Sequence, residues 1–294
     1  MAQSSEHSEP ATLLLTISKH DTIKIGLPPK REDDNFHKRA QVLGKMAHAH
    51  HVISSPSGEL FCVGRHGDLY RGPLPANKED NWFSKATKVG KSEWRNFKFV
   101  FFHPNGELYG ATEEGELYKG PQPTNENVPW MTEQATALGG FHWKNYEALF
   151  FDLSGNLFAL GKHGIIMKGK PLTQADYENW ETTAKMFPDN GWYKHTEFMS
   201  FCPDGYLWSV NKKGNIFRSI MVDNGENIEY PEKMGKGYDD YSFLSFTKDN
   251  TISSIISFEF LIERGKILSD SPEYLENKKY SNFSGDTPLK HTFT

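Results

Sequence analysis

The feature that most constrains the fold is a segment of about 48 residues that recurs along the chain. Its most regular part, FHPNGELYGATEEGELYKGPQP (102–123), returns with changes as SSPSGELFCVGRHGDLYRGPLP (54–75), FDLSGNLFALGKHGIIMKGKP (151–171) and FCPDGYLWSVNKKGNIFRS (201–219). The turn glycines of the four copies lie 48, 49 and 50 residues apart: Gly58, Gly106, Gly155 and Gly205. A period of this length is typical of propellers and solenoids.

A second landmark keeps nearly the same spacing. An aromatic residue followed at short range by alanine occurs as Phe36 with Ala40, Trp82 with Ala86, Trp130 with Ala135, and Trp180 with Ala184. A weaker fifth copy, FLSFTKDNTISSI (243–255), aligns with FVFFHPNGELYGA (99–111). The N-terminal LLLTISKHDTIKIGLPP (13–29) aligns with residues 59–75. An incomplete repeat near each end is what a closed ring requires.

Each copy has the pattern of four short strands. Apolar residues alternate or cluster, and PNG and EEG supply tight turns, while the stretches 82–90 and 97–102 complete the set of strands. The sequence therefore predicts an all-β fold: a five-bladed β-propeller with four-stranded antiparallel blades, the last blade closed by the N-terminal strand. An open solenoid is the alternative, but it should carry polar caps that the sequence does not show.

The repeats also predict the domain boundaries. We expect a flexible N-terminal segment (1–11), a propeller domain (12–257), and a C-terminal extension or the start of a second β module (258–294). The net charge of −5, with no basic block longer than PPKR, argues against nucleic acid as a partner. Cys62 and Cys202 are too few for a disulfide framework.

The segment DNW-x3-A-x3-G-x3-W-x2-F-x-F-x-F-F-x-P-x-G-x-L-Y-G (80–110) resembles the repeat of the tachylectin-2 family of five-bladed β-propeller lectins. The resemblance extends over residues 12–257 and is strongest in the second copy. It implies a protein without catalytic activity that binds N-acetylglucosamine and N-acetylgalactosamine, one sugar in each crevice between neighbouring blades. It also implies a role in innate immune defence.

The residue types fit sugar binding. Carboxylate and amide groups can hold sugar hydroxyls, and an aromatic ring can pack against the C–H face of a pyranose. The candidate carbohydrate-binding residues are Asp34, Asn35 and Phe36 in the first copy, Asp80, Asn81 and Trp82 in the second, Trp130 in the third, Asn179 and Trp180 in the fourth, and Trp94, Trp143 and Trp192 as a wall for the acetamido group. The alternative is that the aromatic residues only pack between blades and that Asp-Asn only caps a turn.

Other patterns are weaker. His48, His50 and His51 have a spacing that a metal site could use, but no matching cluster accompanies them, so we expect neither a metal nor another cofactor. Acidic pairs do not recur at channel positions, which disfavours a glycosidase. The tail (258–294) is similar to the opening of an aerolysin-type pore-forming module.

We therefore expect a multivalent lectin whose partners are N-acetylated hexosamines on cell-surface or microbial glycans. Membrane contact would occur only through glycans or through a missing pore module, and self-association stays open. The glycan-targeting part of an aerolysin-like pore-forming protein and a protein-binding propeller scaffold are the alternatives. The polar, acidic N-terminus has no signal-peptide pattern, which predicts a cytoplasmic protein or release by a non-classical or granule route.

Overall fold

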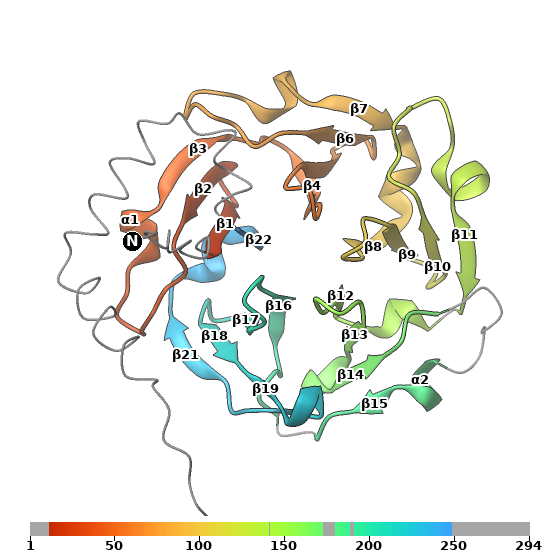
Figure 1. Cartoon of the computed structure of the whole chain (residues 1–294). Helices are drawn as coiled ribbons and strands as arrows, with labels where there is room; N and C mark the ends of the chain where they lie inside the picture. The colour runs from red at the N-terminus through yellow and green to blue at the C-terminus, as the bar shows by residue number, and fades with distance from the viewer. Residues whose placement is uncertain (1–11, 141, 173–179, 189–190, 249–294) are drawn as a thin grey trace, which may run out of the picture. The chain divides into compact units, whose positions relative to one another are not determined.

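The computed structural model describes residues 12–140, 142–172, 180–188 and 191–248. These residues form five four-stranded antiparallel sheets around a central axis, and each sheet is one blade of a propeller (Figure 1). In this part of the chain no helix is long and apolar enough to cross a membrane. The predicted all-β, five-bladed propeller is confirmed.

Blades 2 to 5 follow one another along the chain. Blade 2 contains β4 (Ala49–Ser54), β5 (Leu60–Gly64), β6 (Leu69–Gly72) and β7 (Thr87–Gly90). Blade 3 contains β8 (Phe97–Phe102), β9 (Leu108–Thr112), β10 (Leu117–Gly120) and β11 (Thr136–Gly139). Blade 4 contains β12 (Ala148–Phe151), β13 (Leu157–Leu160), β14 (Ile166–Gly169) and β15 (Lys185–Met186). Blade 5 contains β16 (Thr196–Phe201), β17 (Leu207–Asn211), β18 (Ile216–Ser219) and β21 (Glu232–Gly235).

Short elements connect these strands. Blade 5 carries an extra hairpin, formed by β19 (Met221–Val222) and β20 (Asn227–Ile228), between its last two strands. The helices are single turns: α1 (Phe36–Arg39), α2 (Trp180–Thr183), and the segments Trp82–Ser84, Ser92–Asn96, Trp130–Gln134, Trp143–Asn145, Lys162–Gly164, Asp223–Gly225 and Tyr238–Asp240.

Blade 1 closes the ring, because it combines strands from the beginning and the end of the described chain. Its order is β22 (Tyr241–Lys248), β1 (Thr12–Ser18), β2 (Thr22–Gly26) and β3 (Gln41–Lys45). β1 pairs with β22 along its whole length, from Thr12 opposite Lys248 to Ser18 opposite Tyr241. The prediction of closure by the N-terminus is confirmed, and the structure adds that three strands of this blade, not one, come from that side.

The second strand of each blade lies between two neighbouring strands and is the most buried. All residues of β5, β9 and β13 are buried. Gly110 in β9 shows how tightly the strands pack, because a Cβ atom there would lie 2.6 Å from the ring of Phe97. Gly106 adopts a positive φ of 92° in the turn before β9, a conformation that glycine accepts without strain.

One predicted strand is shorter than expected. The sequence predicts a strand over 82–90, but residues Trp82–Ser84 form a helical turn and β7 begins only at Thr87. The Asn81 side chain accepts a hydrogen bond from the backbone N–H of Phe83, which caps the turn. A local side-chain bond thus overrides the extended pattern of these residues.

Part of the prediction lies outside the described residues. This holds for segment 1–11, for the end of the fifth copy including Asn250, and for the tail 258–294 with its resemblance to aerolysin-type proteins. The described portion of the fifth copy, residues 243–248, belongs to β22 as the alignment predicts. The predicted domain boundaries stay predictions.

We expect Leu14→Ala to weaken ring closure. Leu14 is fully buried in β1, opposite Phe246 of β22 and Gly26 of β2. Truncation of such a leucine should lower the free energy of unfolding by roughly 2–5 kcal/mol, measured by urea denaturation. The matched control is Leu153→Ala, because Leu153 is 55% exposed. Equal effects of the two changes would contradict a central role for β1.

Candidate functional site

Four predicted aromatic residues lie inside the molecule, just before the last strand of a blade. Phe36, Trp82, Trp130 and Trp180 are at most 2% exposed. The indole N–H of each tryptophan donates to a backbone carbonyl earlier in the same loop: Trp82 to Pro73 (2.8 Å), Trp130 to Pro121 (2.8 Å) and Trp180 to Lys170 (2.9 Å). These rings therefore fix the loop that leads into the outer strand.

The second set of predicted aromatic residues packs against the first. Trp94 contacts Trp130 and Trp143 contacts Trp180, with ring centroids 5.2 Å apart in both pairs. Trp94 and Trp143 have no exposed surface. The two sets together fill the space where the link between blades meets the outer strand.

Trp192 does not occupy the place that the sequence alignment predicts for it. Trp94 lies twelve residues before the turn glycine Gly106, and the residue twelve positions before Gly205 is Tyr193. Tyr193 is 6% exposed and its hydroxyl lies 2.7 Å from that of Ser219. The alignment is thus wrong by one residue, and the shift leaves Trp192 37% exposed at the surface.

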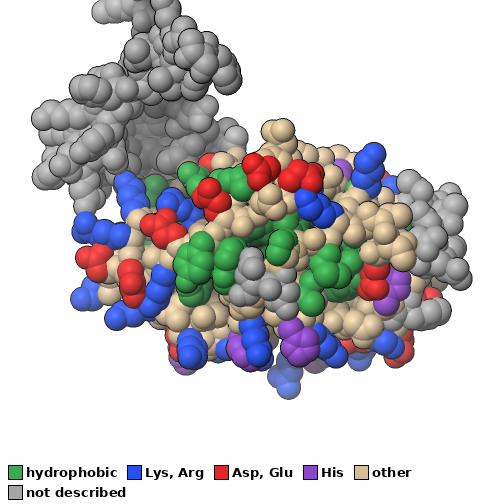
Figure 2. Space-filling model, turned by 90° about the horizontal axis from the view of Figure 1, so that it is seen from below, with side chains coloured by type: hydrophobic (Ala, Val, Ile, Leu, Met, Phe, Trp, Pro, Cys, Tyr) green, Lys and Arg blue, Asp and Glu red, His purple; other side chains and the backbone are tan. Residues whose placement is uncertain are grey.

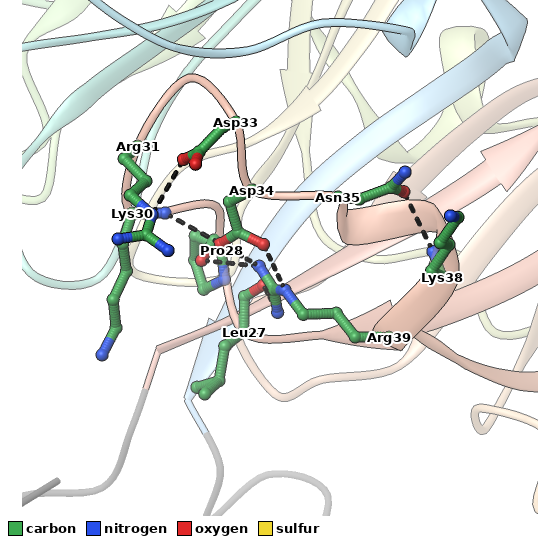
Figure 3. Close-up of polar contacts among 9 residues, drawn as sticks. All are labelled: Leu27, Pro28, Lys30, Arg31, Asp33, Asp34, Asn35, Lys38 and Arg39. Atoms are coloured by element: carbon green, nitrogen blue, oxygen red, sulfur yellow. Dashed lines mark hydrogen bonds and ion pairs between the residues drawn. The ribbon is translucent and has the colours of Figure 1, made fainter. Parts of the chain in front are cut away.

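The Asp-Asn pairs are engaged in local contacts. The Asp34 carboxylate accepts hydrogen bonds from the Arg39 guanidinium at 2.7 and 2.9 Å and from the Lys30 backbone N–H (Figure 3). Asn35 caps α1 by accepting from the Lys38 N–H (Figure 3). The Arg39 guanidinium also donates to the carbonyls of Leu27 and Pro28. It therefore connects the beginning of the loop that follows β2 with Asp34 near the end of that loop.

The second copy repeats this arrangement at the seam between blades 1 and 2. Asp80 forms an ion pair with Lys85 at 2.6 Å, and Asn81 caps the following turn. The Asp80 carbonyl accepts the backbone N–H of Lys45, which belongs to the outer strand of blade 1. Asn179 lies outside the described residues.

The burial of the rings bears on their expected role. A sugar cannot pack on a buried indole without displacing other side chains, so the structure favours the packing alternative for Phe36, Trp82, Trp94, Trp130, Trp143 and Trp180. Asp34, Asn35, Asp80 and Asn81 have structural partners, and a contact of these groups with a sugar stays a prediction.

An open pocket does lie between blades 4 and 5. Its volume is about 200 Å³. We name it the aromatic pocket, and its lining residues are Gly164, Ile166, Phe187, Pro188, Trp192, Tyr193, Asn227 and Ile228. The exposed ring of Tyr230 meets Trp192 edge to face, with centroids 5.2 Å apart. The Asn227 amide donates to the Asp223 carboxylate at 2.7 Å.

Sequence reasoning found Trp192 but missed the other residues of this pocket. Asn227 and Ile228 form β20, in the extra hairpin of blade 5, where the sequence departs from the repeat. The extra residues between Ser219 and β21, which the other copies lack, were the sequence signal that could have indicated a site here. Figure 2 shows hydrophobic side chains gathered on the side of the ring that lies at the bottom of Figure 1, where β15 and β19 are found.

The histidine run shows no metal centre in the described part of the chain, where no group of three or more His, Cys, Asp or Glu side chains could hold an ion. His50 and His51 stack with centroids 4.6 Å apart. Burial, together with the neighbouring His50, lowers the pKa of His51 to about 4. Cys62 and Cys202 are free and buried, and burial raises the pKa of each thiol to about 12.

Comparisons with known proteins agree with this fold. The family model described as Tachylectin matches residues 16–253. A solved structure from work on the de novo evolutionary emergence of a symmetrical protein has a TM-score of 0.71 and 26% identity, covering 80% of this chain and 98% of its own. A search of curated proteins finds no match.

Two further solved structures have lower TM-scores and lower sequence identity to this chain. YCF48 bound to a D1 peptide has a TM-score of 0.37 and 14% identity, covering 76% of this chain and 68% of its own. The calcium-binding protein regucalcin from Agrobacterium tumefaciens has a TM-score of 0.40 and 14% identity, covering 78% and 79%. These two likenesses support no conclusion about this chain.

Trp82→Ala should act on stability. Loss of a fully buried tryptophan lowers the free energy of unfolding by roughly 3–5 kcal/mol. Trp192→Ala is the matched control, because Trp192 is partly exposed, and it should cost less than about 1.5 kcal/mol. Urea denaturation measures both. A Trp82→Ala protein as stable as the parent would show that this indole is not a packing residue.

His51→Gln should reduce the loss of stability in mild acid. The pKa of His51 is lowered on folding, so the unfolded chain binds the extra proton between roughly pH 6.5 and pH 4 and stability falls as pH drops through this window. Urea denaturation at pH 7 and pH 4.5 should show a loss smaller by on the order of 1–3 kcal/mol in the variant. An unchanged loss would mean that His51 takes up its proton equally well in the folded state.

Proposed function

The chain belongs to the tachylectin family, and on that basis we propose that it is a non-enzymatic, multivalent lectin for N-acetylglucosamine and N-acetylgalactosamine. Family membership implies a lectin. The observation that carries the choice of site is the aromatic pocket, where the structure leaves a tryptophan ring accessible beside an amide side chain.

The chemistry of the aromatic pocket suits an N-acetylated hexosamine. The exposed Trp192 ring can pack against the C–H face of a pyranose. The Asn227 amide has both donor and acceptor atoms for hydroxyl or acetamido groups, and the side chains of Ile166 and Ile228 offer an apolar wall for the acetamido methyl. The pocket is smaller than the roughly 300–1,000 Å³ typical of sites for drug-sized ligands, so it suits one sugar residue.

The repeat supports more than one site. The seam between blades 1 and 2 places Asp80 and Asn81 beside the outer strand of blade 1, and we keep these two residues as a second candidate site. A single monosaccharide site is weak, but two sites on one clustered glycan raise avidity by roughly 10²–10⁴. We therefore propose that the targets are glycan-covered surfaces, microbial or cellular, as in innate defence.

A protein-binding scaffold is the second candidate function, because the ring has an open pocket on its axis. This pocket has a volume of about 480 Å³ and is lined by one inner strand from each blade, at Ser54, Phe102, Phe151, Phe201 and Ser245. Leu153 at its edge is 55% exposed. The pore-forming alternative depends on residues 258–294, outside the described residues, and stays a prediction.

A glycan array followed by calorimetry tests the lectin proposal. We expect binding to terminal N-acetylated hexosamines and a loss of at least about tenfold in affinity for Trp192→Ala, which removes the stacking surface. Leu153→Ala is the control and should bind normally. If Leu153→Ala lost binding and Trp192→Ala did not, the sugar site would be in the axial pocket and not in the aromatic pocket. Absence of hexosamine binding at millimolar sugar would favour the scaffold.

A further inference from the structure

A second cavity lies beside the aromatic pocket and has a different character. Its volume is about 200 Å³. Its lining includes one acidic and five basic residues: Glu147, Lys162, His163, Lys194, His195 and Lys212. We name it the basic pocket. Three lysines and two histidines line it together with one carboxylate, in a chain whose net charge is −5.

Three separate segments build the basic pocket, and backbone contacts hold them together. Lys162 and His163 lie in the turn between β13 and β14, and this turn packs on the link to blade 5 so closely that a Cβ on Gly164 would lie 2.4 Å from the Lys194 nitrogen. The turn between β17 and β18 joins them through the Lys212 N–H, which donates to the His195 carbonyl at 2.9 Å. The blade framework thus sets the backbone positions of these basic residues, whose side chains are exposed.

The lysines of the basic pocket lack acidic partners. Among the described residues, no ion pair or hydrogen bond engages the ammonium groups of Lys162, Lys194 or Lys212. Some lysines elsewhere in the ring are paired with carboxylates: Lys85 with Asp80, Lys88 with Asp68, Lys119 with Glu107, Lys185 with Glu226, and Lys233 with Glu32. Three unpaired ammonium groups around one cavity are a ready site for an anion.

The basic pocket adjoins the aromatic pocket. Gly164 and Tyr193 line both cavities, and Trp192 and Lys194 flank Tyr193 in the sequence, one lining each cavity. Figure 2 shows several Lys, Arg and His side chains along the lower edge of this face, below the hydrophobic side chains. One ligand can therefore present an apolar sugar face to the first cavity and a charged substituent to the second.

We propose that the crevice between blades 4 and 5 recognises acidic glycans, with the sulfate or carboxylate of the ligand held in the basic pocket. The proposal rests on the lectin function and deepens it by naming the glycan class. Ammonium groups form short, charge-assisted hydrogen bonds with such oxyanions, and these bonds are stronger than those of neutral groups. Glu147 also lines the cavity and repels an anion, but the three lysines outnumber this single carboxylate.

Calorimetry with matched sugars tests the proposal. The probes are N-acetylgalactosamine, its 6-sulfate, and a disaccharide that joins it to glucuronic acid. In low salt, we expect one or both acidic probes to bind about tenfold more tightly than the neutral sugar, and an advantage that shrinks as salt screens the charges. The sulfate and carboxylate arms show which anion the pocket prefers.

Paired variants locate the effect. Lys162→Gln with Lys212→Gln should remove the advantage of the acidic probes and leave affinity for the neutral sugar unchanged. Lys119→Gln with Lys233→Gln is the control, because it makes the same change in net charge at lysines that are paired elsewhere. The control should keep the advantage, and thermal unfolding should be similar for both pairs.

The outcomes separate this proposal from the lectin proposal. Binding of the neutral sugar without any advantage for an acidic probe would overturn only the basic pocket. An advantage that survives Lys162→Gln with Lys212→Gln would overturn it as well. If no probe binds, neutral or acidic, then the lectin function fails and the basic pocket fails with it.

Discussion

The pairing of β1 with β22 is the interaction on which the rest of the structure depends. It joins residues 12–18 to residues 241–248 and makes blade 1 a sheet of strands from both parts of the sequence. The entropy of closing so long a loop grows only slowly with its length, so the buried strand contacts of one blade can offset it. Because this pairing completes the ring, every blade has a neighbouring blade on each side.

Much of the fold could be predicted from the sequence because the repeat is a physical period. The spacing of Gly58, Gly106, Gly155 and Gly205 reflects one turn per blade, and incomplete copies near both ends indicate closure. The exposure of the aromatic residues was harder to predict. A tryptophan repeated in each copy has the same pattern whether it packs between blades or faces a ligand, and only the coordinates show Trp82 to be buried.

The candidate site arises where the repeat is irregular. A one-residue shift puts Tyr193 in the packing position and leaves Trp192 outside, and the extra hairpin brings Asn227 and Ile228 beside it. The lysines of the basic pocket come from segments about 20 to 30 residues apart, so no local pattern unites them. Regular positions of the copies thus build the ring, and departures from the pattern build the crevice between blades 4 and 5.

The composition of blade 1 has a consequence for synthesis of the chain. Three of its strands are made before blades 2 to 5, whereas β22 is made after them. Until then β1 presents an unpaired edge whose leucines have no cover, a form that invites pairing with other chains. Exchange of β22 between two such chains would complete blade 1 in each of them, which is the geometry of a domain-swapped dimer.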